Sequence, residues 1–328
     1  MRFFIFTLGC QMNYSDSERI TTILQNKKYK SASEKEADLI IVNACSVRQK
    51  AVDRIWGKIK KWQKLDKKII LTGCVLPSDK KKFKSRGVEF KNFTNDNFFD
   101  IAPHFSSHIS YIPIMTGCDN YCSYCAVPYT RGKEKSRPME NIICDIKRAL
   151  KNNSKEILLL GQNVNSYKFG FAKLLKKIDS LEGNFSFNFI SSNPHDMTDE
   201  IIDTFAQLKK WPRELHLPLQ SGDDEILKAM NRKYTSKQYL ELVRKLRYAI
   251  CKMRLSTDII VGFPGETKTQ FNNTVKFCKK IKFFKVYIAQ YSPRPGTAAE
   301  KLNDNVSHDE KKRRWKVLEK LINKRERQ

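Results

Sequence analysis

The stretch Gly117-Cys-Asp-Asn-Tyr-Cys-Ser-Tyr-Cys125 places three cysteines, Cys118, Cys122 and Cys125, within eight residues. A four-iron cluster normally takes one thiolate per iron, so three cysteines leave one iron open to a small molecule. Zinc is the alternative, but structural zinc sites want four ligands and usually show two separated cysteine pairs. No second pair follows here. The spacing therefore favours an iron–sulfur cluster with one open iron.

The chain has 328 residues, which is long enough for two domains with large cores. Its 62 Lys and Arg outnumber its 35 Asp and Glu, which gives a formal charge of +27. Such an excess points to a polyanionic partner such as nucleic acid. The alternative is a lysine-rich, well-solvated surface without a binding role.

Composition also bears on location. No stretch approaches the ~20 apolar residues that a membrane-spanning helix needs. The apolar residues 2–8 are too few for a signal peptide, and no small-residue cleavage site follows them. Nine cysteines, an odd number with three clustered, fit metal binding in a reducing cytoplasm better than disulfides.

The first hundred residues alternate short apolar runs with stretches of helical periodicity. Strands are expected at 3–8, 38–43 and 68–72, and helices at 15–25 and 49–62. Such alternation predicts a parallel sheet with right-handed crossovers.

A cysteine follows each of these strands, at Cys10, Cys45 and Cys74. The carboxyl ends of parallel strands share one edge, where ligands bind. We therefore expect the three cysteines to converge there as a second three-thiolate site. Singly, each would pass as an inert buried cysteine.

The polar segment 92–110 is typical of an interdomain connection. Beyond it, six strands and their intervening helices predict an incomplete (β/α)6 barrel with its site at the strand carboxyl ends. The strands are expected at 111–115, 156–160, 186–190, 214–217, 255–261 and 286–290, and the helices at 139–151, 171–181, 198–208, 223–230, 236–250 and 268–281. Glycine-bearing or polar runs follow the strands and define the rim of a pocket.

Two further expectations concern helices. Residues 307–328 predict a basic amphipathic helix, with Trp315, Leu318, Leu321 and Ile322 as its apolar stripe. The three remaining cysteines lie in helical apolar patterns, and core packing is expected for each of them: Cys144, Cys251 and Cys278.

A CxxxCxxC motif after the first strand of a barrel resembles the radical S-adenosylmethionine (SAM) superfamily. With the second cysteine triad, the whole chain resembles the methylthiotransferases, and it is most similar to their bacterial MiaB group. The motifs that carry this resemblance are Gly9-Cys-Gln-Met-Asn13, Asn43-Ala-Cys-Ser-Val-Arg48, Gly73-Cys-Val75, Leu215-His-Leu-Pro-Leu-Gln-Ser-Gly222, Val127-Pro-Tyr-Thr-Arg-Gly132, Ser136-Arg-Pro138 and Gly161-Gln-Asn-Val-Asn165.

The resemblance implies an activity: addition of a methylthio group to C2 of isopentenyl-adenosine beside the tRNA anticodon. It implies an α/β methylthiotransferase domain at 1–105, a partial (β/α)6 radical SAM core at 106–300 and a basic C-terminal helix at 301–328. It also implies two 4Fe-4S clusters, SAM, tRNA and a reductase or a ferredoxin- or flavodoxin-type electron donor, in a cytoplasmic monomer. Aromatic C–H bonds are too strong for acid–base catalysis, so a cofactor must supply a radical.

The resemblance also assigns residues. Cys118, Cys122 and Cys125 would hold the cluster that binds SAM and cleaves it to a 5′-deoxyadenosyl radical, whereas Cys10, Cys45 and Cys74 would hold the cluster that carries the donated sulfur. The remaining assignments are Gly161, Gln162, Asn163, Ser192, Gln220 and Gly262 for SAM, with Tyr129 and Arg131 for the substrate base and phosphate. For Gly262 the alternative is a simple turn, and for Arg131 it is pairing with an acid.

The sequence departs from the family pattern at two places. It has Ser192-Asn193-Pro194 where the family usually has Ser-His-Pro. The family usually also carries a small C-terminal tRNA-binding β-barrel (TRAM domain), which would begin near Gln328, where this sequence stops. Either the sequence is trimmed or the lineage lacks that domain, and RNA affinity would then rest on the basic surface.

Three alternative functions remain at this stage. Two are related transferases, which act on threonylcarbamoyl-adenosine in tRNA or on an aspartate of a ribosomal protein. The third is a non-catalytic protein that binds zinc and nucleic acid, which would have no need of the glycine-bearing loops at 161–163 and 262–266.

Overall fold

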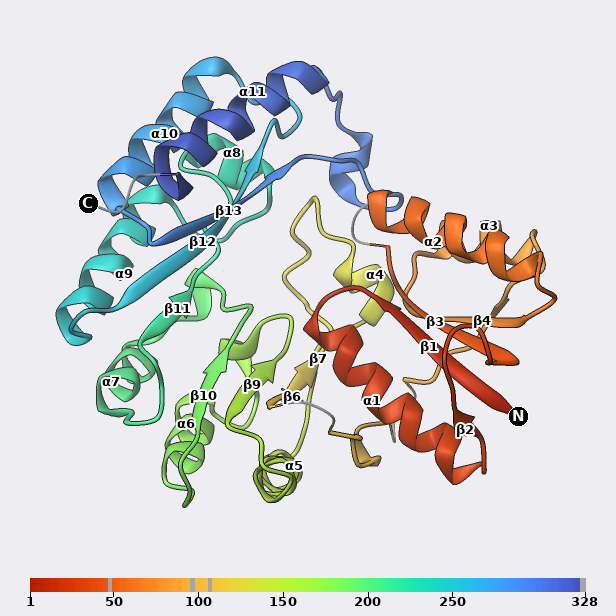
Figure 1. The fold of residues 1–328 in the computed structure, drawn as a ribbon. Coiled ribbons are helices and arrows are strands. Elements are labelled where there is room, and N and C mark those ends of the chain that lie inside the picture. The colour runs from red at the N-terminus through yellow and green to blue at the C-terminus, as the bar shows by residue number, and fades with distance from the viewer. Residues whose placement is uncertain (47–48, 95–97, 106–107, 325–328) are drawn as a thin grey trace. The chain divides into compact units, whose positions relative to one another are not determined.

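The computed structural model describes residues 1–46, 49–94, 98–105 and 108–324, drawn as a coloured ribbon in Figure 1. The chain divides into two compact units. Unit 1 comprises Met1–Asp119, Cys125–Gly161 and Arg294–Gly296, and unit 2 comprises Asn120–Tyr124, Gln162–Pro293 and Thr297–Gln328. The three-part division expected from the sequence stays a prediction.

Unit 1 begins with a five-stranded sheet in which all neighbouring strands are parallel. Its strand order is β2-β1-β3-β4-β5, and the parallel sheet predicted from the sequence is thereby confirmed. The strands are β1 (Arg2–Leu8), β2 (Lys30–Ser31), β3 (Leu39–Cys45), β4 (Lys68–Cys74) and β5 (Glu89–Phe90), and the helices between them are α1 (Gln11–Asn26), α2 (Gln49–Gln63) and α3 (Pro77–Lys84).

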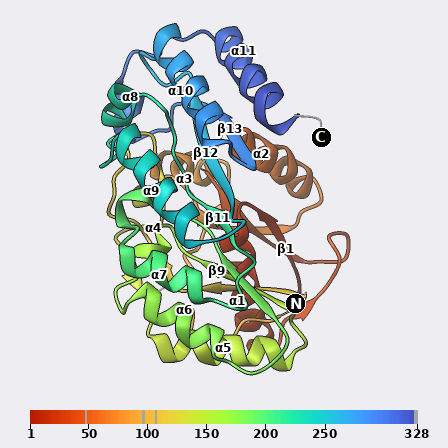
Figure 2. The same ribbon diagram turned by 90° about the vertical axis from the view of Figure 1, so that its left-hand side faces the viewer.

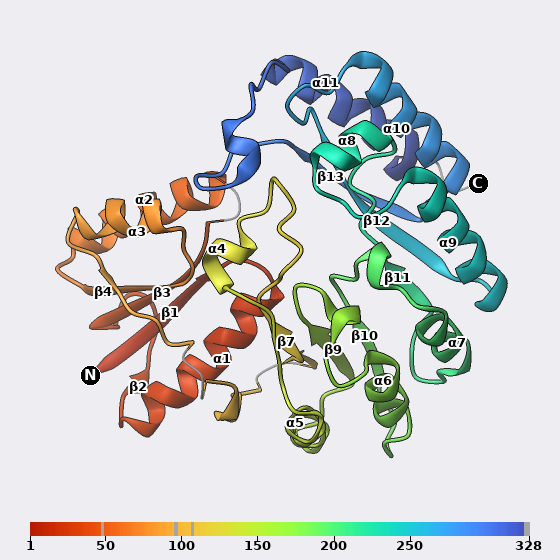
Figure 3. The ribbon, with the colours of Figure 1, turned by 180° about the vertical axis from the view of Figure 1, so that it is seen from behind.

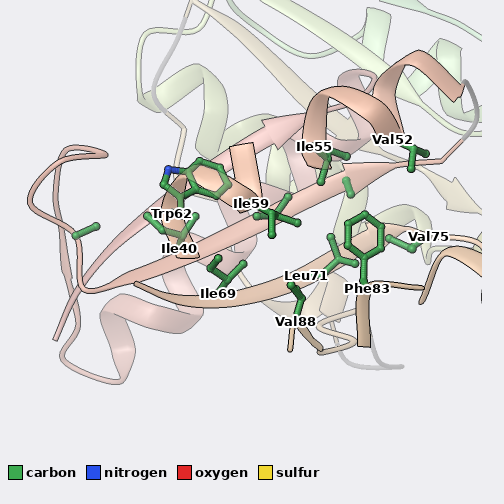
Figure 4. Close-up of a cluster of buried hydrophobic side chains, with 13 residues drawn as sticks. Ile40, Val52, Ile55, Ile59, Trp62, Ile69, Leu71, Val75, Phe83 and Val88 are labelled. Atoms are coloured by element: carbon green, nitrogen blue, oxygen red, sulfur yellow. The ribbon is translucent and has the colours of Figure 1, made fainter. Parts of the chain in front are cut away.

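Helices cover both faces of this sheet, which explains the unbroken apolar run of β3. On one face, Ile40 and Val42 belong to a hydrophobic cluster with Ile55, Ile59 and Trp62 of α2. Figure 4 shows Ile40 beside these residues of α2. The other face belongs to a second cluster, which contains Ile41 of β3 together with residues of α1. The central strands are therefore buried on both sides, and their carboxyl ends are fixed in register.

The rest of unit 1 follows a parallel pair of strands, β6 (Ile109–Pro113) and β9 (Glu156–Leu160). The single strand expected at 111–115 is wrong, because a separate strand β7 (Met115–Thr116) pairs antiparallel with β8 (Lys135–Ser136). Gly117 then adopts a φ of +79°, and a Cβ there would collide with the carbonyl oxygen of Lys133. Two helices complete this part, α4 (Val127–Arg131) and α5 (Met139–Lys151).

The segment expected to be an interdomain connection contributes to the core of unit 1. Phe93 and Phe98 both belong to the cluster on the α1 side of the sheet, and Phe98 begins a short 3₁₀ helix, Phe98–Asp100. The burial of these two aromatic side chains anchors the segment to the core, although most residues around them are polar. Residues 95–97 and 106–107 of this segment lie outside the described residues, as do Val47 and Arg48 of the second quoted motif.

Unit 2 continues the alternation of helices and strands. Strands β11, β12 and β13 form a parallel sheet, with α9 and α10 along one side of it (Figure 3). Its elements are α6 (Phe171–Asp179), β10 (Ser186–Phe189), α7 (Asp199–Gln207), β11 (Glu214–His216), α8 (Asp224–Ala229), α9 (Ser236–Ala249), β12 (Arg254–Val261), α10 (Lys268–Ile281), β13 (Lys285–Gln290) and α11 (His308–Leu318), with 3₁₀ helices at Val164–Ser166, Pro194–Asp196 and Ala298–Lys301.

The C-terminal helix is shorter than expected. Regular α11 ends at Leu318 and widens into a π-helical turn, Glu319–Asn323; residues 325–328 lie outside the described residues. The side chain of Asn323 accepts a hydrogen bond from the backbone nitrogen of Val286 (3.1 Å) and donates one to its carbonyl oxygen (2.8 Å). The indole of Trp315 donates to the carbonyl oxygen of Ile288. The helix therefore covers the open edge of β13 (Figure 2).

Among the residues that the structure describes, no helix has the length and apolar character needed to cross a bilayer.

Candidate functional site

The triad of Cys10, Cys45 and Cys74 lies at the carboxyl edge of the sheet in unit 1. Cys45 and Cys74 end β3 and β4 and are direct register partners. Cys10 follows β1, the other neighbour of β3, and precedes the first residue of α1. Cys10 is exposed, Cys45 is half-buried and Cys74 is buried. The parallel topology thus brings to one edge three cysteines that lie far apart in the sequence.

Two buried asparagines connect the turns that carry these cysteines. The side chain of Asn13 donates to the Asn43 side chain (3.0 Å) and to the carbonyl oxygen of Ala44 (3.1 Å). Asn43 in turn donates to the backbone of Asn13 (2.7 Å) and to Ser17. The Asn13 oxygen also accepts from the backbone nitrogen of Cys10. No role was predicted for these asparagines from the sequence, although both belong to the quoted motifs.

Two glycines make this close packing possible. A Cβ on Gly9 would collide with the side chain of Asn13. Gly73 has a φ of +92°, and a Cβ there would collide with Asn43 and with the backbone of Ala44. Glycine beside Cys10 and Cys74 is therefore a steric requirement.

Arg131, assigned to the substrate by the resemblance, pairs with an acid in the structure, and its contact with the substrate stays a prediction. Its Nε donates to Cys74 Sγ at 2.9 Å, and its Nη2 pairs with Asp16 at 2.8 Å. The structure therefore agrees with the alternative in which Arg131 pairs with an acid. The Arg131 side chain is 8% exposed. Tyr129 on the same helix α4 is 44% exposed, and its contact with the substrate stays a prediction. Burial raises the pKa of the Cys74 thiol to about 12, and the Arg131 guanidinium opposes that rise.

Single-ion ligation and cluster ligation make different geometric demands. Within the described residues, no three His, Cys, Asp or Glu side chains already surround a point as ligands of one ion do. A four-iron cluster puts each thiolate on a different iron, so its cysteines stand farther apart. Both cluster assignments stay predictions.

The triad of Cys118, Cys122 and Cys125 lies on the loop after β7, and all three cysteines are half-buried. In unit 1, the backbone nitrogen of Cys118 donates to the carbonyl oxygen of Gly132 (3.2 Å), while Cys125 precedes α4. In unit 2, Arg232 Nη1 donates to Cys122 Sγ at 3.4 Å. Ser123 is held by two bonds to the backbone at the end of α8, from its hydroxyl to Ala229 and from its nitrogen to Met230.

Arg232 connects Cys122 to two other loops of unit 2. Its Nη2 donates to the carbonyl oxygen of Pro218 (3.1 Å) and to the side chain of Asn193 (3.4 Å). Its Nε donates to the hydroxyl of Tyr234. The Asn193 that stands in place of the family's histidine is thus a contact of this guanidinium. Arg232 was not predicted from the sequence, because none of the quoted motifs contains it.

Four of the residues assigned to SAM share an unusual feature. Each carries a buried side-chain oxygen without a hydrogen-bond partner among the described residues: Gln162 Oε1, Asn163 Oδ1, Ser192 Oγ and Gln220 Oε1. An unsatisfied buried polar atom costs about 1–3 kcal/mol. Four of them on the loops after β9, β10 and β11, all in unit 2, are what a polar ligand would satisfy. The residues therefore fit SAM.

The two glycines assigned to SAM differ in what the structure shows. Gly161 is buried directly after β9. Gly262 has a φ of +69°, and a Cβ there would collide with the side chain of Lys311. Its backbone nitrogen donates to Glu266, which also pairs with Arg314. A tight turn under α11 thus accounts for Gly262, and its contact with adenine stays a prediction.

The prediction that the three remaining cysteines pack in the core is correct for one of them and wrong for the other two. Cys278 is buried on α10, whereas Cys144 and Cys251 are exposed. On α5 the buried positions include Ile142, Ile143 and Ile146, and Cys144 lies outside that stripe. Cys251 follows the end of α9 and is not in a helix.

Comparison with known proteins matches both halves of the chain. Residues 112–278 match the family model of the radical SAM superfamily, and residues 2–93 match the model described as uncharacterized protein family UPF0004. The chain also resembles the structure of the radical SAM methyltransferase TsrM from Kitasatospora setae. That likeness has a TM-score of 0.67 at 13% identity, and it covers 91% of this chain and 76% of that one. It supports the radical SAM fold.

Curated relatives extend over nearly the whole chain. The tRNA-2-methylthio-N(6)-dimethylallyladenosine synthase of Endomicrobium trichonymphae is 40% identical, over 99% of this chain and 84% of that protein. The protein of the same name from Thermotoga petrophila is 37% identical, over 99% of this chain and 83% of that protein. The chain therefore belongs to the tRNA-2-methylthio-N(6)-dimethylallyladenosine synthase family of radical SAM enzymes.

Proposed function

We propose that the protein adds a methylthio group to C2 of isopentenyl-adenosine beside the tRNA anticodon. The observation that carries this proposal is the near-complete match to relatives named for that product. The cysteine positions support it, because Cys10, Cys45 and Cys74 share one sheet edge in unit 1. Since the family consists of radical SAM enzymes, a non-catalytic zinc protein no longer competes.

The two triads would hold two 4Fe-4S clusters. A cluster with an open iron supplies the electron and the binding point that SAM cleavage needs. Cys118, Cys122 and Cys125 hold the SAM cluster in this proposal, within the core assigned to 106–300. Cys10, Cys45 and Cys74 hold the sulfur-bearing cluster, within the domain assigned to 1–105. The basic helix assigned to 301–328 contributes to RNA binding.

The loops of unit 2 would hold SAM by its polar groups. The Ser192 hydroxyl binds a sugar hydroxyl, and the oxygens of Gln162, Asn163 and Gln220 accept from donors of SAM. Each of these oxygens is buried and without a partner among the described residues. Asn163 is already oriented, because its amide nitrogen donates to Asp196 at 2.7 Å.

Three further proposals concern partners and location. The electron for each SAM cleavage comes from a reductase or from a ferredoxin- or flavodoxin-type protein. The protein acts as a monomer in the cytoplasm, where its tRNA substrate is found. A reducing compartment suits cysteines that serve as cluster ligands better than it suits disulfides.

Nucleoside analysis tests the substrate. A bacterial strain without its own enzyme should accumulate unthiolated isopentenyl-adenosine in its tRNA, and this 328-residue chain should restore the methylthio form. Mass spectrometry of digested tRNA measures both nucleosides. The matched control is Cys118→Ala, which removes one cysteine assigned to the SAM cluster. Restored methylthiolation of threonylcarbamoyl-adenosine, or of a ribosomal protein aspartate, would move the assignment to a sister enzyme.

A pair of serines tests the SAM site. Ser192 and Ser221 are both buried, but Ser192 Oγ has no partner among the described residues whereas Ser221 Oγ is bonded to Thr274. S192A should leave the stability of the ligand-free protein unchanged or slightly raised, and it should weaken SAM binding about tenfold. S221A should lower stability and leave SAM affinity unchanged. Equal SAM affinity of both variants would remove Ser192 from the site.

A further inference from the structure

Arg131 makes two side-chain contacts inside unit 1. Its Nη2 pairs with the Asp16 carboxylate, with Nη2 and Oδ2 2.8 Å apart. Its Nε, on the same edge of the guanidinium, donates to Cys74 Sγ at 2.9 Å. Asp16 is 2% exposed, so neither partner can be exchanged for water without cost. An arginine placed in this way is not available to a phosphate of the substrate.

Arg131 is also close in the sequence to a cysteine assigned to the SAM cluster. Arg131 ends α4, which begins two residues after Cys125. A single short segment therefore carries a ligand assigned to the SAM cluster and a donor to a ligand assigned to the other cluster. Arginine also differs from lysine here, because its planar fork presents Nε and Nη2 to two partners at fixed angles.

We propose that Arg131 is a positioning residue that holds Cys74 and sets the reduction potential of the cluster on Cys10, Cys45 and Cys74. The proposal rests on the second cluster of the proposed function. Reduction adds one electron to the cluster and makes it more negative. An N–H donor and a positive charge at a ligand sulfur stabilise that reduced state and raise the potential.

Because Asp16 pairs with Arg131, the proposal predicts shifts in reduction potential of opposite sign when one or the other residue is changed. The carboxylate partly cancels the positive charge of Arg131 at the sulfur. Removal of Arg131 leaves an uncompensated buried anion and lowers the potential, whereas neutralisation of Asp16 leaves an uncompensated cation and raises it. A residue that only supported the fold would not produce shifts of opposite sign from the two partners of one ion pair.

The experiment uses the full chain with Cys118, Cys122 and Cys125 changed to alanine, so that only the cluster in question remains. Each variant is reconstituted without oxygen, its iron is counted, and its midpoint potential is measured by dithionite titration followed by electron paramagnetic resonance. The variants are R131M, R131K and D16N. The control is R294K, because Arg294 forms a similarly buried pair with Asp79 in unit 1.

The parent should hold about four irons. In R131M the ratio of reduced to oxidised cluster at a fixed potential should fall about tenfold, which corresponds to about 59 mV for a one-electron couple. D16N should shift the potential upward, R131K should lie between R131M and the parent, and R294K should match the parent. Shifts of the same sign in R131M and D16N, or no shift in either, would overturn the role of Arg131. Absence of iron from the parent would overturn the second cluster, and this proposal with it.

Discussion

At the scale of single residues, Glu18 on α1 predicts a dependence of stability on pH. Burial raises the pKa of its carboxyl from 4.5 to about 8, against the opposing charge of Arg19. Its Oε2 has no hydrogen-bond partner among the described residues. Between pH 4.5 and 8 the folded protein therefore holds a proton that the unfolded chain has released, and stability falls as pH rises through this window.

The variant E18Q keeps the neutral form at every pH. It should match the parent near pH 4.5 and become more stable than the parent by about 1–3 kcal/mol at pH 8. Urea unfolding at several pH values measures the difference. Glu36 is the control, because a hydrogen bond from Ser33 lowers the pKa of its exposed carboxyl. E36Q should not gain stability as pH rises, and a parallel gain in both variants would show that Glu18 is not the cause.

Residue roles were predictable where one element fixes them. Cys10, Cys45 and Cys74 could be placed on one edge from the sequence, because each follows a strand of the same parallel sheet. The bond from Arg131 to Cys74 could not be predicted, since 57 positions separate the two residues and no periodicity relates a helix end to a strand end. Cys144 was misplaced because one position along a helix separates a buried face from an exposed one.

At the scale of elements, Asn323 protects the edge of a sheet. Strand β13 lies at the end of the order β11-β12-β13, and such an edge offers unpaired backbone groups to other chains. The amide of Asn323 satisfies both backbone groups of Val286. N323A should lower stability by about 1–2 kcal/mol and increase self-association, as measured by urea unfolding and light scattering.

Two variants in the same turn calibrate this prediction. N323D keeps the acceptor for the Val286 nitrogen and loses the donor to its carbonyl oxygen, so its stability should lie between those of the parent and N323A. K320A changes an exposed side chain one helical turn away and should leave both measurements unchanged. If N323A aggregates no more than K320A, α11 rather than its last turn protects the edge.

Strands and helices rich in apolar residues could be predicted from the sequence, whereas polar ones were missed. The strands β1, β3 and β4 are buried on one or both faces, so their apolar runs mark them. No observed end of these strands differs from the expected one by more than two residues. Helix α3 was missed because its sequence PSDKKKFK buries a single aromatic side chain, Phe83, which leaves no periodicity to detect. Pro77 at its first turn was a usable start signal.

At the scale of the whole molecule, the formal charge of +27 is not all available to a partner. Several buried basic side chains pair with buried acids: Arg19 and Arg137 with Asp145, Arg131 with Asp16, Arg294 with Asp79 and Arg314 with Glu266. Even on α11, Lys311 is buried against Asp304, and Arg313 pairs with Glu310. Any electrostatic affinity for RNA must therefore come from the exposed lysines and arginines.

Lys312 and Lys316 on α11 are exposed and should contribute to tRNA binding. K312E/K316E should weaken binding and reduce the slope of log affinity against log salt by about one for each phosphate that the variant no longer neutralises. The control K81E/K84E changes two exposed lysines of α3 and lowers the net charge equally, so it should weaken binding less. Filter binding over a range of salt concentrations measures both, with iron content as the check on folding. Equal weakening in the two variants would mean that overall charge, and not binding along α11, attracts the RNA.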